Sequence, residues 1–254
     1  MRALPTTIAA LLIVSAVTML CAEPSVVVYP SGPTVPENLL RIELRFSTPL
    51  HPPLSINNLK LVDATGIEIK DPFLDLLLPS QDDKRVTILF HPGRVKTGVG
   101  ANLALGRALH AGESVTLVID HPALAKPVFK NWQVTAFDGE SPQPSRWTFE
   151  HPQLGSRSPL MLHLDKSISS TAENLIAIRG PDGLRLPGEA RLENGETVWH
   201  FVPSRPWQAG NYAVVTHPDL EDCAGNRTCA PFEVADESRI PDEEGTVQPF
   251  ELLK

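Results

Sequence analysis

The chain has 254 residues, carries 30 acidic against 22 basic residues, and contains 25 prolines but only 16 glycines. The net charge of −8, without a basic cluster, argues against nucleic acid and anionic lipid as partners. The prolines are spread along the chain, which favours turns and edge strands over long helices. The length allows one or two domains, each with its own core.

Residues 1–22 have the order of a secretory signal peptide. Arg2 precedes the uncharged apolar run Thr7–Leu20, and Ala22 offers a cleavage position. Because the run is too short to span a bilayer comfortably, we expect an exported protein, periplasmic or extracellular. Its mature chain would begin at Glu23 and contain no transmembrane span.

Lipidation of Cys21 is the alternative fate of this segment. Removal of the signal just before Cys21 would expose a cysteine that can carry a lipid anchor and tether the protein to a membrane. Leu20 is bulky for the position before a lipidated cysteine, which favours cleavage after Ala22 instead.

A first β-domain is predicted over residues 23–138. In Leu40–Phe46 apolar residues alternate with charged ones, the period of a strand with one solvated face. A second strand pattern at 59–61 ends in the turn Asp63–Gly66, whose residues are typical of a hairpin. A further strand with apolar residues facing the core is predicted at 86–90. We expect the core side of the opening strand to consist of Leu40, Ile42, Leu44 and Phe46.

The segment from Arg94 to His110 is predicted to be an insertion. The second half of the chain bridges the corresponding interval with only Ser204–Gln208. If the protein binds a ligand through this loop, Arg94 and Lys96 are its candidate binding residues.

A second domain is predicted over residues 146–236, after a proline-containing linker at 139–145. The landmarks of the first domain recur in order about 100 residues later, which suits two copies of a complete domain. Residues 237–254 form an acidic tail, whose strand-like segment Val247–Leu252 either docks on the body or acts as a sticky terminus. The paired landmarks are Pro92 with Pro203, Ala111-Gly112 with Ala209-Gly210, and Trp132-Gln-Val134 with Phe232-Glu-Val234.

Short strands without a convincing helical period predict an all-β fold of two tandem sandwiches with Greek-key connections. The stretch Pro36–Leu50, which contains Phe-Ser-Thr-Pro-Leu, and the later Asp219–Asn226 resemble bacterial Ig-like domains of the surface-layer-protein type. In that family a strand ending in Phe-Ser-x-Pro-[Leu/Met] opens the domain, and an Asp-x-x-Gly-Asn turn precedes the last strand. The resemblance implies a spacer, adhesive or accessory module. The first copy lacks the Gly-Asn turn and has Asp120–Leu124 instead.

Cys223 and Cys229 are predicted to form a disulfide. An exported chain meets oxidising surroundings, and the turn at Gly225-Asn226 can bring the two cysteines together. Two free thiols, or half of a metal site, are the alternatives.

The same turn offers oxygen ligands. Asp219, Glu221, Asp222 and Asn226 carry the hard donors that Ca²⁺ prefers, although their spacing is not that of a defined calcium loop. The alternative is that Asn226 supplies a positive-φ turn and the acids are solvated. No other cofactor is expected.

Five of the eight histidines directly precede proline, a context typical of loop edges. We therefore expect these histidines to be exposed in loops. The alternative is a metal-carrying role, as in the periplasmic copper carriers, which are also Ig-like. Those carriers have a histidine at the mature N-terminus, whereas a mature chain beginning at Glu23 has none there. The five are His51, His91, His121, His151 and His217.

Trp147 and Trp207 lie in junction or proline-rich segments, where flat rings could stack on sugars. We favour packing over this role, with Trp147 between the two copies and Trp207 as the plug of a loop. No nucleophile-and-base motif is evident; the carboxylates of Glu68, Asp71 and Asp75 are expected to be solvated.

The sequence thus predicts a non-catalytic Ig-like binding or structural module of the bacterial cell envelope, with an envelope protein or polysaccharide as partner. The alternatives are a periplasmic carbohydrate-binding or metal-carrying accessory protein, and an enzyme of unrecognised type.

Overall fold

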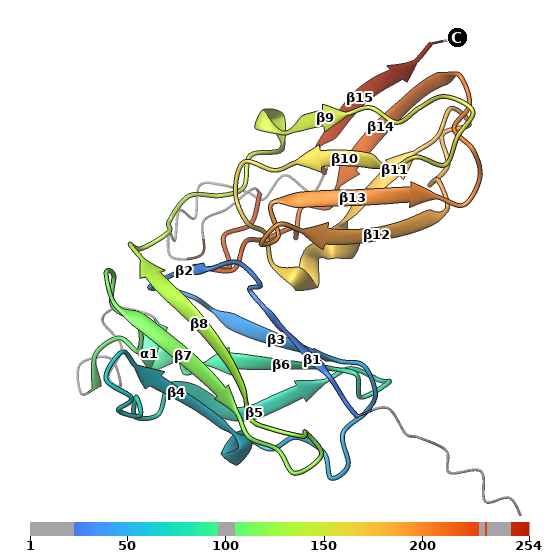
Figure 1. Cartoon of the computed structure of the whole chain (residues 1–254). Coiled ribbons are helices and arrows are strands. Elements are labelled where there is room, and N and C mark those ends of the chain that lie inside the picture. Colours follow the sequence, from blue (N-terminus) through green and yellow to red (C-terminus); the bar gives the residue numbers. More distant parts are fainter. Residues whose placement is uncertain (1–22, 96–104, 229–231, 233–244, 254) are drawn as a thin grey trace, which may run out of the picture.

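The chain folds into two β-sandwiches, each made of two sheets (Figure 1). The computed structural model describes residues 23–95, 105–228, 232 and 245–253. We call the sandwich of β1 to β8 the first domain and that of β9 to β15 the second domain. The predicted all-β fold with tandem sandwiches is confirmed.

In the first domain, one sheet has the order β1-β3-β6-β5 and the other the order β2-β8-β7-β4. All pairs are antiparallel except β2 with β8, which run parallel. The strands are β1 (Val26–Tyr29), β2 (Thr34–Pro36), β3 (Arg41–Phe46), β4 (Leu59–Asp63), β5 (Phe73–Pro79), β6 (Arg85–Phe90), β7 (Ser114–Ile119) and β8 (Val128–Thr135), with short helices η1 (Ile56–Asn58) and α1 (Pro92–Val95) between them.

In the second domain, the sheets have the orders β9-β10-β13-β12 and β11-β14-β15. Seven strands divided in this way have the arrangement of an immunoglobulin constant-type domain, in which the first, second, fifth and fourth strands share a sheet. The elements are η2 (Pro144–Arg146), β9 (Thr148–Glu150), β10 (Leu160–His163), η3 (Ser170–Leu175), β11 (Ile176–Arg179), β12 (Gly188–Glu193), β13 (Val198–Pro203), β14 (Gly210–Thr216) and β15 (Val247–Leu252).

The two domains correspond strand by strand, with β3 to β8 equivalent to β10 to β15, and β2 has no equivalent among the described residues of the second domain. This equivalence corrects one predicted match. Val247–Leu252, and not the segment at Phe232, takes the place of the strand that contains Trp132. The strand-like end of the predicted tail therefore docks, pairing antiparallel with β14.

Each domain has its own apolar core. In β3 the side chains of Ile42, Leu44 and Phe46 are buried as predicted, and Leu160 and Leu162 occupy the same place in β10. Leu40 is only partly buried, because it precedes β3 and turns toward the second domain, where it lies against Gly225.

The hairpin turns predicted after β4 and β11 are confirmed. The N–H groups of Gly66 and Gly183 each donate to the carbonyl oxygen three residues earlier, of Asp63 and Gly180. Both glycines have positive φ, 84° and 79°, the conformation that such turns require. No helix among the described residues is long and apolar enough to cross a bilayer.

Candidate functional site

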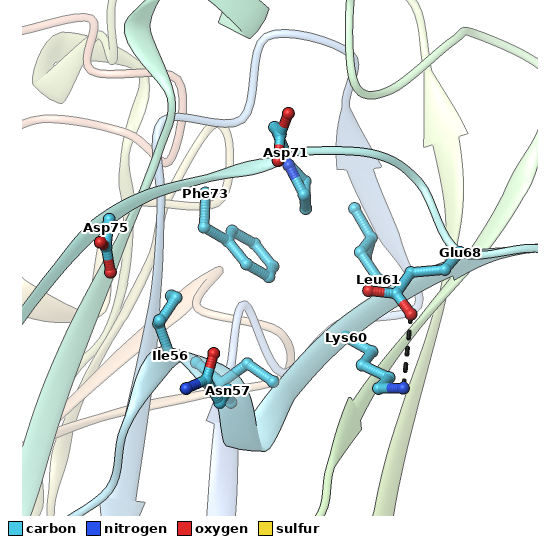
Figure 2. Close-up of a pocket in the computed structure, with 10 residues that line it drawn as sticks. Ile56, Asn57, Lys60, Leu61, Glu68, Asp71, Phe73 and Asp75 are labelled. Carbon is cyan, nitrogen blue, oxygen red and sulfur yellow. Dashed lines mark ion pairs between the residues drawn. The ribbon is translucent and has the colours of Figure 1, made fainter.

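A surface hollow lies between the edge strands β4 and β5 of the first domain (Figure 2). It has a volume of about 470 Å³, within the range typical of ligand pockets. We call it the β4/β5 groove and define it by its lining residues, which are Ile56, Asn57, Leu59, Lys60, Leu61, Glu68, Asp71, Pro72, Phe73 and Asp75.

The floor of the β4/β5 groove is apolar and belongs to the core. Leu59, Leu61 and Phe73 are buried, and the ring of Phe73 packs edge-on against Phe90 with 5.2 Å between centroids. A floor that is part of a packed core holds its shape when the groove is empty.

The rim of the β4/β5 groove is acidic. In Figure 2, Phe73 lies in the middle, Asp75 on one side, and Glu68 with Lys60 on the other. Glu68 pairs with Lys60 at 3.4 Å, whereas Asp71 and Asp75 have no ion-pair partner among the described residues. The three acids were predicted to be solvated surface residues; they are exposed, and the fold gathers them around one groove.

The second domain has an equivalent hollow between β11 and β12, with a volume of about 300 Å³. The isolated bridges Val62 with Glu68 and Arg179 with Arg185 place Glu68 and Arg185 at equivalent positions after the two hairpin turns. Among the described residues that line the second hollow there is no carboxylate, and Arg185 is the charged one. The two copies therefore share the groove and differ in its charge.

The second place where polar side chains converge is the boundary between the domains. Lys166 Nζ lies 2.6 Å from the carboxylates of both Asp138 and Asp222. Asn38 of the first domain and Asn226 of the second both donate through Nδ2 to the carbonyl oxygen of Asp138, at 2.8 and 2.9 Å. Asp138 is thus bonded to both domains.

The charged face of β3 also lies in this boundary. Arg41 pairs with Glu221 at 2.6 Å, and Arg45 pairs with Glu173 at 3.0 Å. Glu43 between them is only 4% exposed. The solvated face predicted from the alternation in β3 is wrong for this reason: the second domain covers it.

A third contact joins the hairpin turn between β12 and β13 to the loop after β1. The carboxylate of Glu196 accepts hydrogen bonds from N–H and Oγ–H of Ser31, at 3.0 and 2.5 Å. Glu196 is buried and has a φ of 61°, unusual for a residue with a side chain. Burial raises its pKa and outweighs the hydrogen bonds from Ser31, which lower it.

The residues of the calcium hypothesis are used in these contacts. Asp222 accepts hydrogen bonds from Lys166 and Asn226, Glu221 pairs with Arg41, and Asp219 pairs with Arg227 at 3.1 Å. No group of three or more ligands that could hold a metal ion occurs in the described part of the chain. The acids of this turn pair with different partners, and the positive φ belongs to Gly225 instead of Asn226.

The predicted disulfide is corrected by the structure, in which Cys223 is a free cysteine. Its side chain is buried in the core cluster of the first domain, and its carbonyl oxygen accepts a hydrogen bond from the N–H of Leu40. Burial raises the pKa of the thiol to about 12. Cys229, the predicted partner, lies outside the described residues.

The tryptophans of the sugar-binding hypothesis are buried, at 4% exposure for Trp147 and 2% for Trp207. Trp147 donates through Nε1 to Asp165 and packs in the core of the second domain, so its predicted place between the copies is also wrong. Trp207 is the predicted loop plug: Nε1 donates to the carbonyl oxygen of Ser158, and the ring contacts Phe201, Tyr212 and Phe250.

Three of the His-Pro pairs form one recurring turn. In each, Nδ1 of the histidine accepts the N–H two residues later, and its carbonyl oxygen accepts the N–H three residues later. His217 is exposed as predicted, but His121 is only 2% exposed, because its turn lies against the first domain's core. The three turns begin at His91, His121 and His217.

Arg94 of the predicted insertion is buried, because its guanidinium donates to the carbonyl oxygens of Leu105 and Gly106. It therefore joins the two described ends of the insertion instead of facing a ligand. Lys96, the other candidate, lies outside the described residues.

No family model matches the chain, and no curated protein matches it. The chain is similar to tandem Ig-like domain pairs among solved structures. A chimeric titin Z1Z2 functionalized with an exogenous KLER peptide from decorin is 12% identical, with 76% of this chain and 88% of that chain covered and a TM-score of 0.25. The titin domains Z1Z2 in complex with telethonin are 14% identical over the same shares, with a TM-score of 0.21. Rst D1-D2 is 5% identical over 84% and 89%, with a TM-score of 0.24.

Proposed function

We propose that this protein is an exported, non-catalytic Ig-like module of the bacterial cell envelope, of the surface-layer-protein type, with a binding or structural role. The observation that supports a structural role is the bonding across the domain boundary. It includes the ion pairs of Lys166 with Asp138, Arg41 with Glu221 and Arg45 with Glu173, and the contact of Glu196 with Ser31.

These contacts fix the angle between the domains. Domains joined by a short linker move relative to one another unless their interface holds them. Here the interface joins β3 to Glu221 and Glu173, Asp138 to Lys166 and Asn226, and Ser31 to Glu196, three sets of contacts that a single hinge motion would have to break together. A pair of domains held in this way suits a spacer that presents a binding surface at a constant position.

Export is tested by expressing the full chain in a Gram-negative host and fractionating the cells. We expect a periplasmic protein whose first residue is Glu23, as determined by intact-mass spectrometry. A lipidated Cys21 in the membrane fraction would identify the anchored form. An uncleaved chain in the cytosol would overturn the proposal. The control is Leu12→Arg, which interrupts the apolar run and is expected to keep the protein in the cytosol.

Rigidity is tested by pulsed electron paramagnetic resonance between labels at Ile67→Cys and Leu184→Cys, in a Cys229→Ser background. The two labelled positions are exposed and lie in different domains. We expect one narrow distance distribution that broadens when Lys166 and Arg45 are replaced by alanine. A broad distribution in the unmodified interface would contradict the role as a rigid spacer.

The binding role is tested by co-sedimentation of the purified protein with bacterial sacculi and, separately, with envelope membranes. Retention by one of the two fractions supports a binding module. If neither fraction retains the protein, the binding part of the proposal fails and only the spacer role is left.

A further inference from the structure

The outer edge of β5 has no strand partner among the described residues. In its sheet β5 pairs with β6 alone and lies at the end of the strand order. Such an edge presents unpaired N–H and C=O groups, which can bind another extended chain. Leu76 and Leu78 of this strand are 49% and 43% exposed, although leucine usually avoids water.

The register of β5 against β6 identifies which backbone N–H groups of β5 face away from β6. The N–H of Ser80 donates to the carbonyl oxygen of Arg85 on the β6 side, and Leu78 lies opposite Thr87. Because antiparallel partners alternate along a strand, the backbone N–H of Leu77 faces away from β6. The next outward position is Pro79, which has no N–H to offer.

The β4/β5 groove runs beside this edge, and its acidic rim favours binding of a positively charged chain. Asp71 and Asp75 have no ion-pair partner among the described residues, and the one basic side chain of the groove, Lys60, is already paired with Glu68. A strand added at β5 would have successive side chains on opposite faces. Every second residue would then lie toward the acids, and those between them toward Leu76 and Leu78.

The second domain provides the internal comparison. Its equivalent groove between β11 and β12 has the same position in the fold but no carboxylate, with Arg185 where the first domain has Glu68. A feature needed only for folding would be expected in both copies. The acidic rim is therefore a property of the first domain's surface and not of the sandwich.

We propose that the β4/β5 groove binds an extended segment of a partner protein in which lysine or arginine alternates with apolar residues, and that this segment pairs with the outer edge of β5. The inference names the partner class of the binding module and so rests on the proposed function. The basic side chains pair with Asp71 and Asp75, and also with Glu68, which they share with Lys60, and the backbone pairs at Leu77.

The test is a fluorescence anisotropy titration of the full-length protein with a labelled eight-residue peptide of alternating lysine and valine. We expect saturable binding that weakens in high salt, and none to a peptide of alternating glutamate and valine. The variant Glu68→Gln/Asp71→Asn/Asp75→Asn should weaken binding about tenfold or more. Glu189→Gln on β12, the strand equivalent to β5, is the matched control and should leave binding unchanged.

Strand pairing is separated from charge attraction by two further measurements. A lysine-valine peptide methylated on every backbone nitrogen keeps its charge but has no N–H donor on either edge, and should not bind. Hydrogen exchange should show protection of the Leu77 amide on binding of the unmodified peptide. Equal binding by the methylated peptide would overturn the strand pairing, and unchanged binding by the triple variant would overturn the groove.

These outcomes are distinct from failure of the proposed function. The titration uses purified protein and does not depend on export or on the domain angle. If the peptide does not bind while the protein is exported and rigid, the groove assignment fails alone. If the peptide binds but the chain stays in the cytosol, the groove assignment survives and the envelope role fails.

Discussion

Lys166 Nζ lies 2.6 Å from Oδ2 of Asp222, a carboxylate with no exposed surface, and equally 2.6 Å from Oδ2 of Asp138, the residue bonded to both domains. Burial lowers the pKa of Lys166, but its hydrogen bonds to Asp138 and Asp222 outweigh this and raise the pKa above the ordinary value. The ammonium group is thus charged at neutral pH and compensates the buried acid.

Replacing Lys166 with alanine is expected to lower the free energy of unfolding by about 3 kcal/mol, because it leaves the charge of Asp222 buried with its hydrogen bonds alone. Urea unfolding at neutral pH measures the loss. The control is Lys60→Ala, which breaks the exposed pair with Glu68 and should cost under about 1 kcal/mol. Equal losses in the two variants would show that the buried pair of Lys166 and Asp222 is not stabilising.

Glu196 makes the stability of the interface depend on pH. Its pKa is raised above the ordinary 4.5, so the folded protein holds this proton more tightly than the unfolded chain does. The stability that the proton contributes is complete below pH 4.5 and is lost as the pH rises through the raised pKa. We expect the free energy of unfolding of the wild type to rise relative to that of Glu196→Gln when the pH is lowered from neutral. Urea unfolding of both proteins across this range tests the sign, and a gap independent of pH would refute it.

Gly195 lies where the backbones of the two domains meet. A Cβ atom there would lie 3.0 Å from Cα of Gly32, and the φ of Gly195 is 66°. Gly195→Ala should therefore cost more than the ~1 kcal/mol of a left-handed alanine alone. Gly183→Ala is the control, because its φ is 79° and a Cβ atom there meets nothing within 4 Å. Thermal unfolding of the two variants should show the larger loss for Gly195→Ala; the reverse order would contradict the close contact.

Cys223 is expected to resist alkylation in the folded protein. Its thiol is buried and its pKa is about 12, so little thiolate is present near pH 8. Iodoacetamide labelling followed by mass spectrometry should find Cys223 unmodified in buffer and modified in urea without a reductant. A peptide in which Cys223 is linked to Cys229 would contradict the free thiol.

The alternating residues of β3 show what a sequence pattern can predict about burial and what it cannot. Ile42 and Leu44 could be assigned to the core because alternation in a strand reports which side chains share a face. The same alternation assigned Glu43 to solvent, and this was wrong, because a charged face can also be covered by another domain. The part of the molecule that covers a strand face is decided only in the folded protein, and no periodicity of the sequence indicates it.

The acids of the β4/β5 groove show the same limit. Glu68 follows a hairpin turn, whereas Asp75 lies in an edge strand. In the sequence each is an ordinary surface carboxylate. Only the packing of one sheet on the other brings them together around Phe73.

The sequence by itself determined the class of fold and its duplication, since strand periods, positive-φ turns and repeated landmarks are local features that act within a few residues. It also placed Trp207 as a loop plug. The tertiary structure alone decided that Cys223 enters the core of the first domain, that Lys166 joins Asp138 to Asp222, and that one groove of two is acidic. These are contacts between residues far apart in the chain, and their energy depends on distance and burial, which only the folded arrangement defines.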